Sequence, residues 1–290
     1  GRICNRRCED ACTRGTIDRA VSIDAVKKFI AEQDLHAEHR YVPDIVVASN
    51  RGRWKEKIAI IGGGPAGLSC AYYLAQMGYY PTVFEKNEKP GGMLTYGIPS
   101  YKLEKNVIDA EIDIMREMGV EIKCGVEVGK DITIDQLRAE GYKAFYVAIG
   151  CQGGKKPNVV GSDAEGVTTA VDFLKVANCG GYAVEGKTIV VGGGNVAIDA
   201  ARVSVRSGAK EVAMYCLETR DIMPASNEEI AEAQEDGVAI NCGWGPKEVV
   251  VENGKAVAVV FKKCLSVFDE NNRFNPVYDE NETQTVACDN

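Results

Sequence analysis

Hydrophobic positions in this 290-residue chain recur at two spacings. Short β-branched runs are typical of buried strands, and apolar residues three and four apart are typical of amphipathic helices. The first run, residues 58–61, precedes a glycine-rich turn and a helix with Leu68, Tyr72 and Ala75 on one face. Gly78 is expected to end that helix. The pattern predicts an α/β fold.

The same spacings predict the other elements. Helices are expected at residues 25–32, 103–118, 134–138 and 228–235, in a short segment from 171 to 176, and in a segment that ends at 207. Strands are expected at 82–84, 120–123, 126–128, 144–149, 188–191, 212–215, 238–241, 247–251 and 256–262. Asn253-Gly254 is the preferred pair for a type I′ hairpin. Residues 286–290 follow a strand pattern without a closing turn, so the chain is expected to stop within a strand.

The first glycine-rich turn has the spacing G-x-G-x-x-G at Gly62, Gly64 and Gly67. In that pattern the first glycine allows the tight turn, the second lets a pyrophosphate approach the backbone, and the third lets the helix pack closely. The helix N-terminus favours phosphate groups. Glu85 follows the next strand, 18 residues after Gly67, where a carboxylate can bind a ribose hydroxyl. We therefore predict a dinucleotide site, since a glycine turn that binds nothing leaves Glu85 unexplained.

The same arrangement recurs 130 residues later in KTIVVGGGNVAID. Gly192, Gly194 and Ala197 form G-x-G-x-x-A between a strand and a helix. Two such units predict two bound dinucleotides, or one dinucleotide and a degenerate relic.

The ribose position of the second unit bears on coenzyme choice. Alignment of the two units places Cys216 where the first has Glu85. Glu218, two residues further on, would disfavour a 2′-phosphate, whereas Arg220 would favour one. The balance favours NAD over NADP, and both coenzymes stay open.

Three cysteines, Cys4, Cys8 and Cys12, are spaced four apart near the N-terminus. If the segment is helical they lie along one face, and closely spaced thiolates suit an iron–sulfur cluster. The alternative is three half-buried cysteines on one helix, and three ligands fall short of the usual four. The helix at 25–32 is expected to present Val26, Phe29 and Ile30 on its apolar face. The polar residues 33–56 read as a linker.

Composition narrows the function. The chain has 45% hydrophobic residues, 26% charged residues and a net charge of −8, which disfavours nucleic acid as a partner. It has no apolar run that could span a membrane and no signal-peptide pattern, so we expect no membrane association and a cytoplasmic location. Eleven cysteines include no C-x-x-C pair, which argues against a dithiol reductase. Both histidines lie in a polar stretch far from the glycine motifs.

Between the two units, the stretch GGMLTYGIPSYKLEK has the character of a shaped ligand loop. Gly91 and Gly92 allow close approach of a ligand to the backbone. Lys102 is a candidate phosphate contact, and a solvated lysine is the alternative. Residues 151–166 are rich in glycine, proline and polar residues and read as a crossing between domains.

Together these motifs resemble the small (beta) subunit of NADPH-dependent glutamate synthase. The same family includes the flavoprotein subunit of NADH-dependent ferredoxin:NADP oxidoreductases and the flavin domains of dihydropyrimidine dehydrogenase. The resemblance covers essentially the whole chain and runs in order through GRICNRRCEDAC, IGGGPAGLSCA, FEK, GGMLTYGIPSYKL, AIG, GGGNVAIDAAR and MPA.

The resemblance implies two Rossmann-like domains arranged as in glutathione reductase, preceded by a short helical cysteine-containing segment. The expected divisions are residues 1–50 for that segment and linker, 51–155 for FAD and 156–290 for NAD(P). FAD is expected at Gly62, Gly64, Ala66, Gly67, Glu85, Gly92, Leu94, Lys102, Val128 and Gly150. The nicotinamide dinucleotide is expected at Gly192, Gly194, Asn195, Val196, Ala197 and Arg220, and a [4Fe–4S] cluster at Cys4, Cys8 and Cys12.

The chain departs from the family pattern in three respects. Relatives complete their clusters with an upstream cysteine segment that is absent here. Two arginines usually follow the second ribose strand, where this chain has Cys216-Leu217. A late Gly-Asp segment that returns to the flavin is also absent, so the chain is expected to be a fragment or a split protein.

The expected function is an electron-input module. NAD(P)H would pass hydride to FAD, and electrons would leave through iron–sulfur clusters or a partner subunit. No catalytic side chain is required. The alternative is a non-catalytic nucleotide-binding fragment or scaffold of a larger electron-transfer complex.

Overall fold

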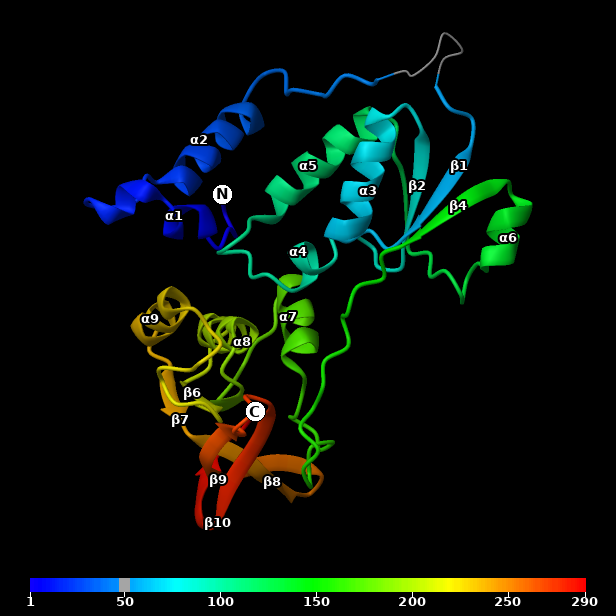
Figure 1. Cartoon of the computed structure of the whole chain (residues 1–290). Coiled ribbons are helices and arrows are strands. Elements are labelled where there is room, and N and C mark those ends of the chain that lie inside the picture. The colour runs from blue at the N-terminus through cyan, green and yellow to red at the C-terminus, as the bar shows by residue number, and fades with distance from the viewer. Residues whose placement is uncertain (47–52) are drawn as a thin grey trace. The chain divides into compact units, whose positions relative to one another are not determined.

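The computed structural model describes residues 1–46 and 53–290. They form two compact units, Gly1–Cys151 and Gln152–Asn290 (Figure 1). Residues 47–52 belong to the expected linker and lie outside the described residues. None of the described helices is both long and apolar enough to cross a membrane.

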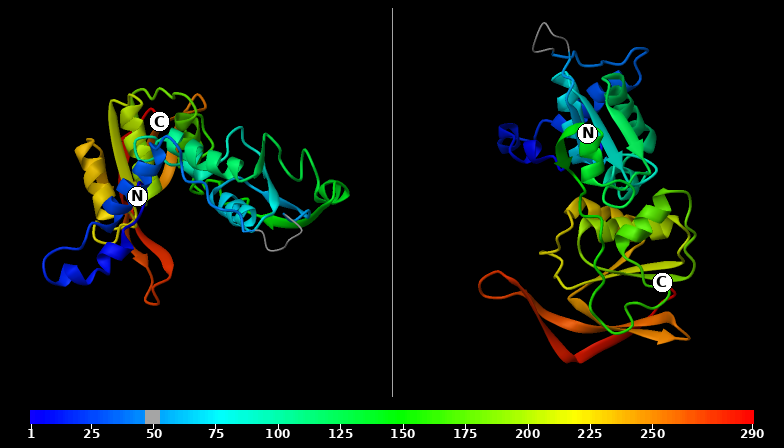
Figure 2. Two further views of the ribbon diagram at one scale, coloured as in Figure 1. Left: turned by 90° about the horizontal axis from the view of Figure 1, so that it is seen from above. Right: turned by 90° about the vertical axis from the view of Figure 1, so that its right-hand side faces the viewer.

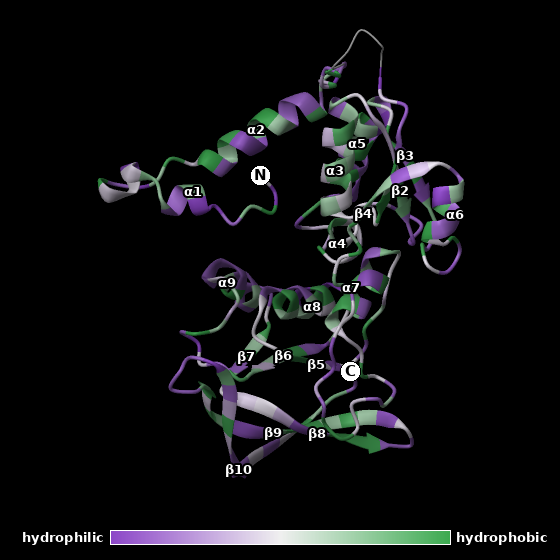
Figure 3. Ribbon diagram, turned by 45° about the vertical axis from the view of Figure 1, so that its right-hand side comes forward, coloured by the Kyte–Doolittle hydropathy of each residue, from purple (hydrophilic) through white to green (hydrophobic). Residues whose placement is uncertain are grey.

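The first unit begins with α1 (Arg7–Asp10), a 3-10 turn η1 (Thr13–Thr16) and α2 (Ile23–Leu35). Helix α2 extends the predicted helix at both ends. Its expected apolar face is exposed rather than packed, because Val26, Phe29 and Ile30 are 53%, 62% and 62% exposed. Hydropathy colouring shows apolar positions interspersed with polar ones along α2 (Figure 3).

A four-stranded parallel sheet forms the centre of the first unit. Its strands are β1 (Lys57–Ile61), β2 (Tyr80–Glu85), β3 (Glu121–Cys124) and β4 (Tyr142–Val147), in the order β3-β2-β1-β4. The helices that accompany it are α3 (Pro65–Gln76), α4 (Met93–Tyr96), α5 (Lys105–Glu117) and α6 (Ile134–Ala139). The strand expected at 126–128 is wrong, since Val128 forms only an isolated bridge with Ile132.

Both faces of β1 are buried, as a central parallel strand requires. Ile60 packs with Ala71 and Ala75 of α3 on one face, and Ala59 packs with Leu137 of α6 on the other. This packing brings the N-terminus of α3 to the carboxyl end of β1.

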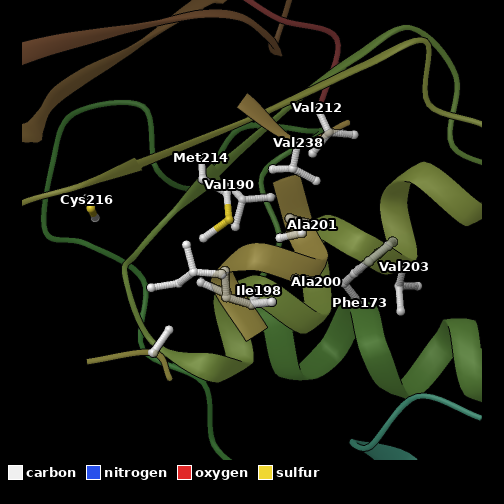
Figure 4. Close-up of a cluster of buried hydrophobic side chains, with 14 of the residues drawn as sticks. Phe173, Val190, Ile198, Ala200, Ala201, Val203, Val212, Met214, Cys216 and Val238 are labelled. Carbon is white, nitrogen blue, oxygen red and sulfur yellow. The ribbon is translucent and has the colours of Figure 1, made fainter. Parts of the chain in front are cut away.

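The second unit repeats this plan with fewer strands. A parallel sheet in the order β5-β6-β7 contains β5 (Lys187–Val191), β6 (Glu211–Cys216) and β7 (Ala239–Cys242). Its helices are α7 (Ala170–Asn178), α8 (Asn195–Arg206) and α9 (Asn227–Glu235). Ile198 and Met214 are fully buried in the core between helices and sheet, and Cys216 lies at its margin (Figure 4).

An antiparallel sheet completes the second unit with β8 (Trp244–Glu252), β9 (Lys255–Phe268) and β10 (Phe274–Ala287). The predicted hairpin is confirmed, because Asn253 and Gly254 have φ of 52° and 82°. The sequence pattern did not reveal most of the 14-residue strand β10, which pairs with β9 (Figure 2). The stretch expected to stop within a strand instead leaves β10 at Ala287, and Asn290 then hydrogen-bonds Lys187 and Ile189 of β5.

Candidate functional site

In the glycine turn of the first unit, two glycines are required by the fold and the third is not. Gly62 has φ of 106°, and a Cβ there would overlap the carbonyl of Ala148. A Cβ on Gly67 would overlap the carbonyl oxygen of Gly62. Gly64 is different, because a Cβ there would meet only the Cα of Gly92, at 3.8 Å. Since the fold does not require glycine at this position, its open backbone fits the close approach of a phosphate.

Glu85 joins the end of β2 to this turn. Its side chain is buried, and its Oε2 accepts a hydrogen bond from the Gly63 amide at 2.7 Å. Its Oε1 accepts from the backbone and side chain of Asn87, at 2.8 and 2.7 Å. A carboxylate has about four acceptor positions, so Glu85 keeps capacity for a ribose hydroxyl while it braces the turn.

The loop after β2 folds back over the glycine turn. The Gly91 amide donates to the carbonyl of Gly63 at 2.7 Å. Gly92 has φ of 56°, and a Cβ there would lie 2.8 Å from the Cα of Gly64. The two glycines therefore let the loop and turn meet backbone to backbone, which explains why the sequence doubles them.

Other predicted flavin-side residues hold this loop in place. Leu94 packs against the core that contains Leu68 and Leu103. Lys102 is half-buried, and its amide donates to the carbonyl of Pro99 at 3.0 Å. Lys105 was not predicted as a site residue, yet its ammonium donates to the carbonyls of Leu94 at 3.0 Å and Ile98 at 2.5 Å. The sequence did not indicate this role, because a lysine at the start of an amphipathic helix is ordinarily exposed to solvent.

Two further predicted positions lie beside the ends of the first unit's strands. The Val126 amide donates to the carbonyl of Glu85 at 3.0 Å. This bond places the segment that leads to Val128 beside Glu85. The Ala148 amide donates to the carbonyl of Ile61 at 2.8 Å, next to the glycine turn. Gly150 follows with φ of 66° and is exposed.

The second glycine turn repeats the first with a looser fit. Gly192 has φ of 142°, and a Cβ there would lie 3.4 Å from the Cβ of Ala197. Gly194 caps the start of α8, and apart from its chain neighbours no atom of the described residues lies within 4 Å of the place that a Cβ would occupy. Val196, in the first turn of α8, is 49% exposed. The first amides of a helix lack the partner that later amides have four residues back, so this helix start can bind a phosphate.

The Met223-Pro224-Ala225 motif covers the second turn, a role that the sequence did not suggest. The Ala225 amide donates to the carbonyl of Gly193 at 3.0 Å, as Gly91 does to Gly63 in the first unit. The Asn195 side chain accepts from the Ser226 amide at 3.0 Å. The motif thus positions the start of α8.

The ribose position of the second unit holds a thiol and, beside it, a carboxylate. A Cβ on Gly193 would lie 3.1 Å from the Cβ of Cys216 and 2.8 Å from Oε2 of Glu218. Burial raises the pKa of Cys216 to about 12, and the Cys242 thiol, 3.8 Å away, adds to the shift. Cys216 is therefore neutral at neutral pH. Arg220 is exposed and donates to the side chain of Asn227 at 3.1 Å.

The three N-terminal cysteines do not lie on one helix. Only Cys8 belongs to α1, whereas Cys4 precedes α1 and Cys12 directly precedes the 3-10 turn. Backbone amides of Val21 and Arg14 hold the pKa of Cys12 below its usual value. The Lys27 ammonium lies 3.6 Å from the Cys4 sulfur. All eleven cysteines are free thiols, and no three His, Cys, Asp or Glu side chains of the described residues are placed to hold a metal ion. The described residues alone do not fit a [4Fe–4S] cluster.

The glycine turns have a counterpart among known proteins. The model of the pyridine nucleotide-disulphide oxidoreductase family matches residues 56–269, a span that contains both turns. The chain belongs to this family. The expected resemblance to the glutamate synthase small-chain group is confirmed by curated relatives at 35–38% identity.

The relatives of this chain include three proteins with different names. The NADP(+)-dependent formate dehydrogenase subunit beta of Moorella thermoacetica is 37% identical over 96% of this chain and 42% of its own length. The Escherichia coli K12 glutamate synthase [NADPH] small chain is 37% identical, over 89% of this chain and 57% of its own. The E. coli K12 NAD-dependent dihydropyrimidine dehydrogenase subunit PreT is 38% identical, over 90% and 61%. The chain thus spans about half the length of these relatives.

Solved structures support the fold. Mycobacterium tuberculosis FprA has a TM-score of 0.68 at 18% identity, covering 81% of this chain and 69% of its own. Lactococcus lactis thioredoxin reductase has a TM-score of 0.57 at 19% identity, covering 81% and 75%. The predicted α/β architecture with two Rossmann-type units is confirmed.

Proposed function

We propose that this chain is the nucleotide-binding part of a flavoprotein oxidoreductase, which accepts hydride from NAD(P)H onto FAD and passes electrons to a partner protein. One observation carries the proposal. Both units join a parallel strand to a helix through a glycine turn whose middle glycine is open, at Gly64 and Gly194, to a phosphate-sized group. The names of the relatives, all subunits or chains of redox enzymes, support it.

FAD is assigned to the first unit. The amides of Ala66 and Gly67 lie in the first turn of α3, where helical amides have no partner within the helix, and they would hold the pyrophosphate. Glu85 would bind the ribose and Val128 would flank the adenine. Gly92, Leu94, Lys102 and Gly150 would line the flavin half.

The nicotinamide dinucleotide is assigned to the second unit. The turn at Gly192 and Gly194 and the helix start at Asn195, Val196 and Ala197 would hold its pyrophosphate. Arg220 would lie on its adenosine side. We divide the chain by function into residues 1–50, 51–155 and 156–290.

Bound FAD supplies the redox chemistry, because a flavin takes two electrons as hydride and releases them singly. The chain's own residues contribute position. Glu85 orients the ribose, the helix starts neutralise phosphate charge, and the loop braced by Lys105 fixes the wall of the site. No side chain is required to move a proton.

Cys4, Cys8 and Cys12 are proposed as ligands of an iron–sulfur cluster that would form only after the segment rearranges to bring the three sulfurs together, with further ligands from outside the described residues. The partner that accepts electrons is proposed to be another subunit or domain. We place this activity in the cytoplasm, where thiols stay reduced.

An anaerobic absorbance titration tests the function. The purified chain, supplied with FAD, should show flavin absorbance that bleaches when NADH or NADPH is added. Gly64→Ala should weaken FAD retention without unfolding, because its Cβ has room in the unliganded fold. Gly153→Ala is the matched control, since a Cβ there would meet no atom of the described residues within 4 Å and the residue lies outside both turns.

Two results would contradict the proposal in different ways. A chain that folds but cannot be loaded with FAD would exclude flavin chemistry by this chain. A chain that binds both nucleotides without bleaching would be a scaffold, the alternative function.

A further inference from the structure

We propose that Glu218 acts as the ribose-binding acid of the second unit and makes the chain select NADH over NADPH. This inference rests on the proposed function, because it assumes that the second glycine turn binds a nicotinamide dinucleotide. It adds the residue that sets coenzyme choice.

The geometry around Gly63 and Gly193, which precede Gly64 and Gly194 in the two turns, carries the inference. In the first unit, a Cβ on Gly63 would lie 3.1 Å from the carboxylate Oε2 of Glu85 and 3.2 Å from its Cβ. In the second, a Cβ on Gly193 would lie 2.8 Å from Oε2 of Glu218, and 3.1 Å from the Cβ of Cys216. The strand position of Glu85 is thus taken by Cys216, but its carboxylate position is taken by Glu218.

The chain reaches this arrangement by returning towards the turn after β6. The Glu218 carbonyl accepts from the Gly243 amide at 2.9 Å and lies 3.6 Å from the Cys216 sulfur. These contacts hold the backbone of Glu218 at the carboxyl end of β6, where the adenosine ribose lies in dinucleotide-binding folds.

The Glu218 carboxylate is free to bind a ligand. The side chain is half-buried, and within residues 1–46 and 53–290 it has no hydrogen-bond or ion-pair partner. Glu85, by contrast, already accepts three hydrogen bonds. A half-buried carboxylate without a partner gains from two ribose hydroxyls, which donate to it.

The 2′-phosphate of NADPH would be repelled by the Glu218 carboxylate. It would bring a second negative charge to the Glu218 carboxylate in a partly desolvated place, where like charges repel more strongly than in water. Asp221 adds a further negative charge in the same loop. Arg220 is the cation that could offset them, and it donates to Asn227 at the start of α9.

Binding titrations with the full chain test the inference. NADH and NADPH are titrated by calorimetry, together with 5′-AMP and 2′,5′-ADP as probes of the adenosine half. We expect NADH to bind at least tenfold more tightly than NADPH. Glu218→Gln should weaken NADH about tenfold and leave NADPH unchanged or tighter, because a charged hydrogen bond is lost and a repulsion is removed.

Glu252→Gln is the control variant, because Glu252 is an exposed carboxylate of β8 outside both glycine turns, and it should change the NADH-to-NADPH ratio less than twofold. Circular dichroism checks that each variant folds. If folded chain binds neither nucleotide nor either probe, the proposed function fails. If it binds both coenzymes and Glu218→Gln leaves their ratio unchanged, or if Glu252→Gln changes the ratio as much as Glu218→Gln does, the inference fails and the proposed function stands.

Discussion

The two glycine turns of this protein share a plan and differ in what completes it. In each, the residue before the open glycine accepts an amide at its carbonyl: Gly63 accepts from Gly91 in the first unit, and Gly193 accepts from Ala225 in the second. In the first, Glu85 is buried and hydrogen-bonded to the turn. In the second, Glu218 is half-buried and has no hydrogen-bond or ion-pair partner in the part of the chain that the structure describes.

The difference separates two uses of one carboxylate position. Glu85 holds the turn together whether or not a ligand is bound, so it suits a cofactor that stays. We expect Glu218 to contribute little to the stability of the unliganded fold, so that its carboxylate is available to bind the coenzyme. Such an acid suits a coenzyme that exchanges with every turnover.

The largest effect is expected at the third position of the two motifs. Gly67→Ala should lower the free energy of unfolding by several kcal/mol, on the order of 3–5, because the new Cβ overlaps the carbonyl oxygen of Gly62. The second unit already has alanine there, and Ala197→Gly should cost only about 1 kcal/mol of helix propensity. Urea denaturation measures both, and equal losses would show that the two helices do not differ in closeness to their turns.

The next largest difference in stability is expected between substitutions of Glu85 and Glu218. Glu85→Gln should lower the free energy of unfolding by about 2 kcal/mol, since an amide nitrogen cannot accept one of the hydrogen bonds that the carboxylate accepts. Glu218→Gln should change it by less than about 0.5 kcal/mol, as at surface sites. Unfolding is measured without nucleotide. A comparable loss in both variants would mean that Glu218 also supports its turn.

The smallest loss of stability is expected where an ion pair fixes α8, the helix after the second glycine turn. Arg202 of α8 is buried and pairs with Asp236 at 2.7 Å, beyond the end of α9. In the first unit, α3 packs through apolar residues. A hydrogen bond from Arg206 holds the pKa of Asp236 below its ordinary value of 3.8, and Arg202 adds to the shift. Asp236→Asn should lower the free energy of unfolding at pH 7 by about 1.5 kcal/mol.

The stabilising contribution of Asp236 depends on pH. Because the folded-state pKa is lowered, the contribution of Asp236 is fully present above pH 3.8 and is lost as the pH falls through the folded value. The Asn variant should therefore differ from wild type at pH 7 and converge with it in acid. Asp135→Asn removes an exposed ion pair with Arg138 and should change little at either pH. Parallel curves for wild type and Asp236→Asn would show that the carboxylate does not titrate with folding.

Most of the elements around the glycine turns were predictable, because local chemistry determines them. The spacing of Gly62, Gly64 and Gly67 with Glu85 specified strand, turn, helix and acid in order, and the structure brings them together. Elements that depend on distant partners were not predictable. The expected strand at 126–128 has only a bridge, and β10, rich in polar residues, owes its length to pairing with β9.

The N-terminal segment shows the same limit. Helical spacing predicted α2 but not the surroundings of its apolar face, which is exposed. The four-residue spacing of Cys4, Cys8 and Cys12 implied one helical face, yet only Cys8 lies in α1. Regular spacing states where side chains would point if the backbone were regular. It does not state that the backbone is regular.

The sequence by itself determined that this protein has two strand–turn–helix units with open glycines, because those turns require particular residues at particular spacings. Only the tertiary structure decided which side chains complete them. It brought Ala225 onto Gly193, Lys105 under the loop after β2, and the carboxylate of Glu218 to the place that Glu85 holds in the first unit. These contacts join residues from separate elements, whose meeting depends on how helices and strands pack and not on any local pattern.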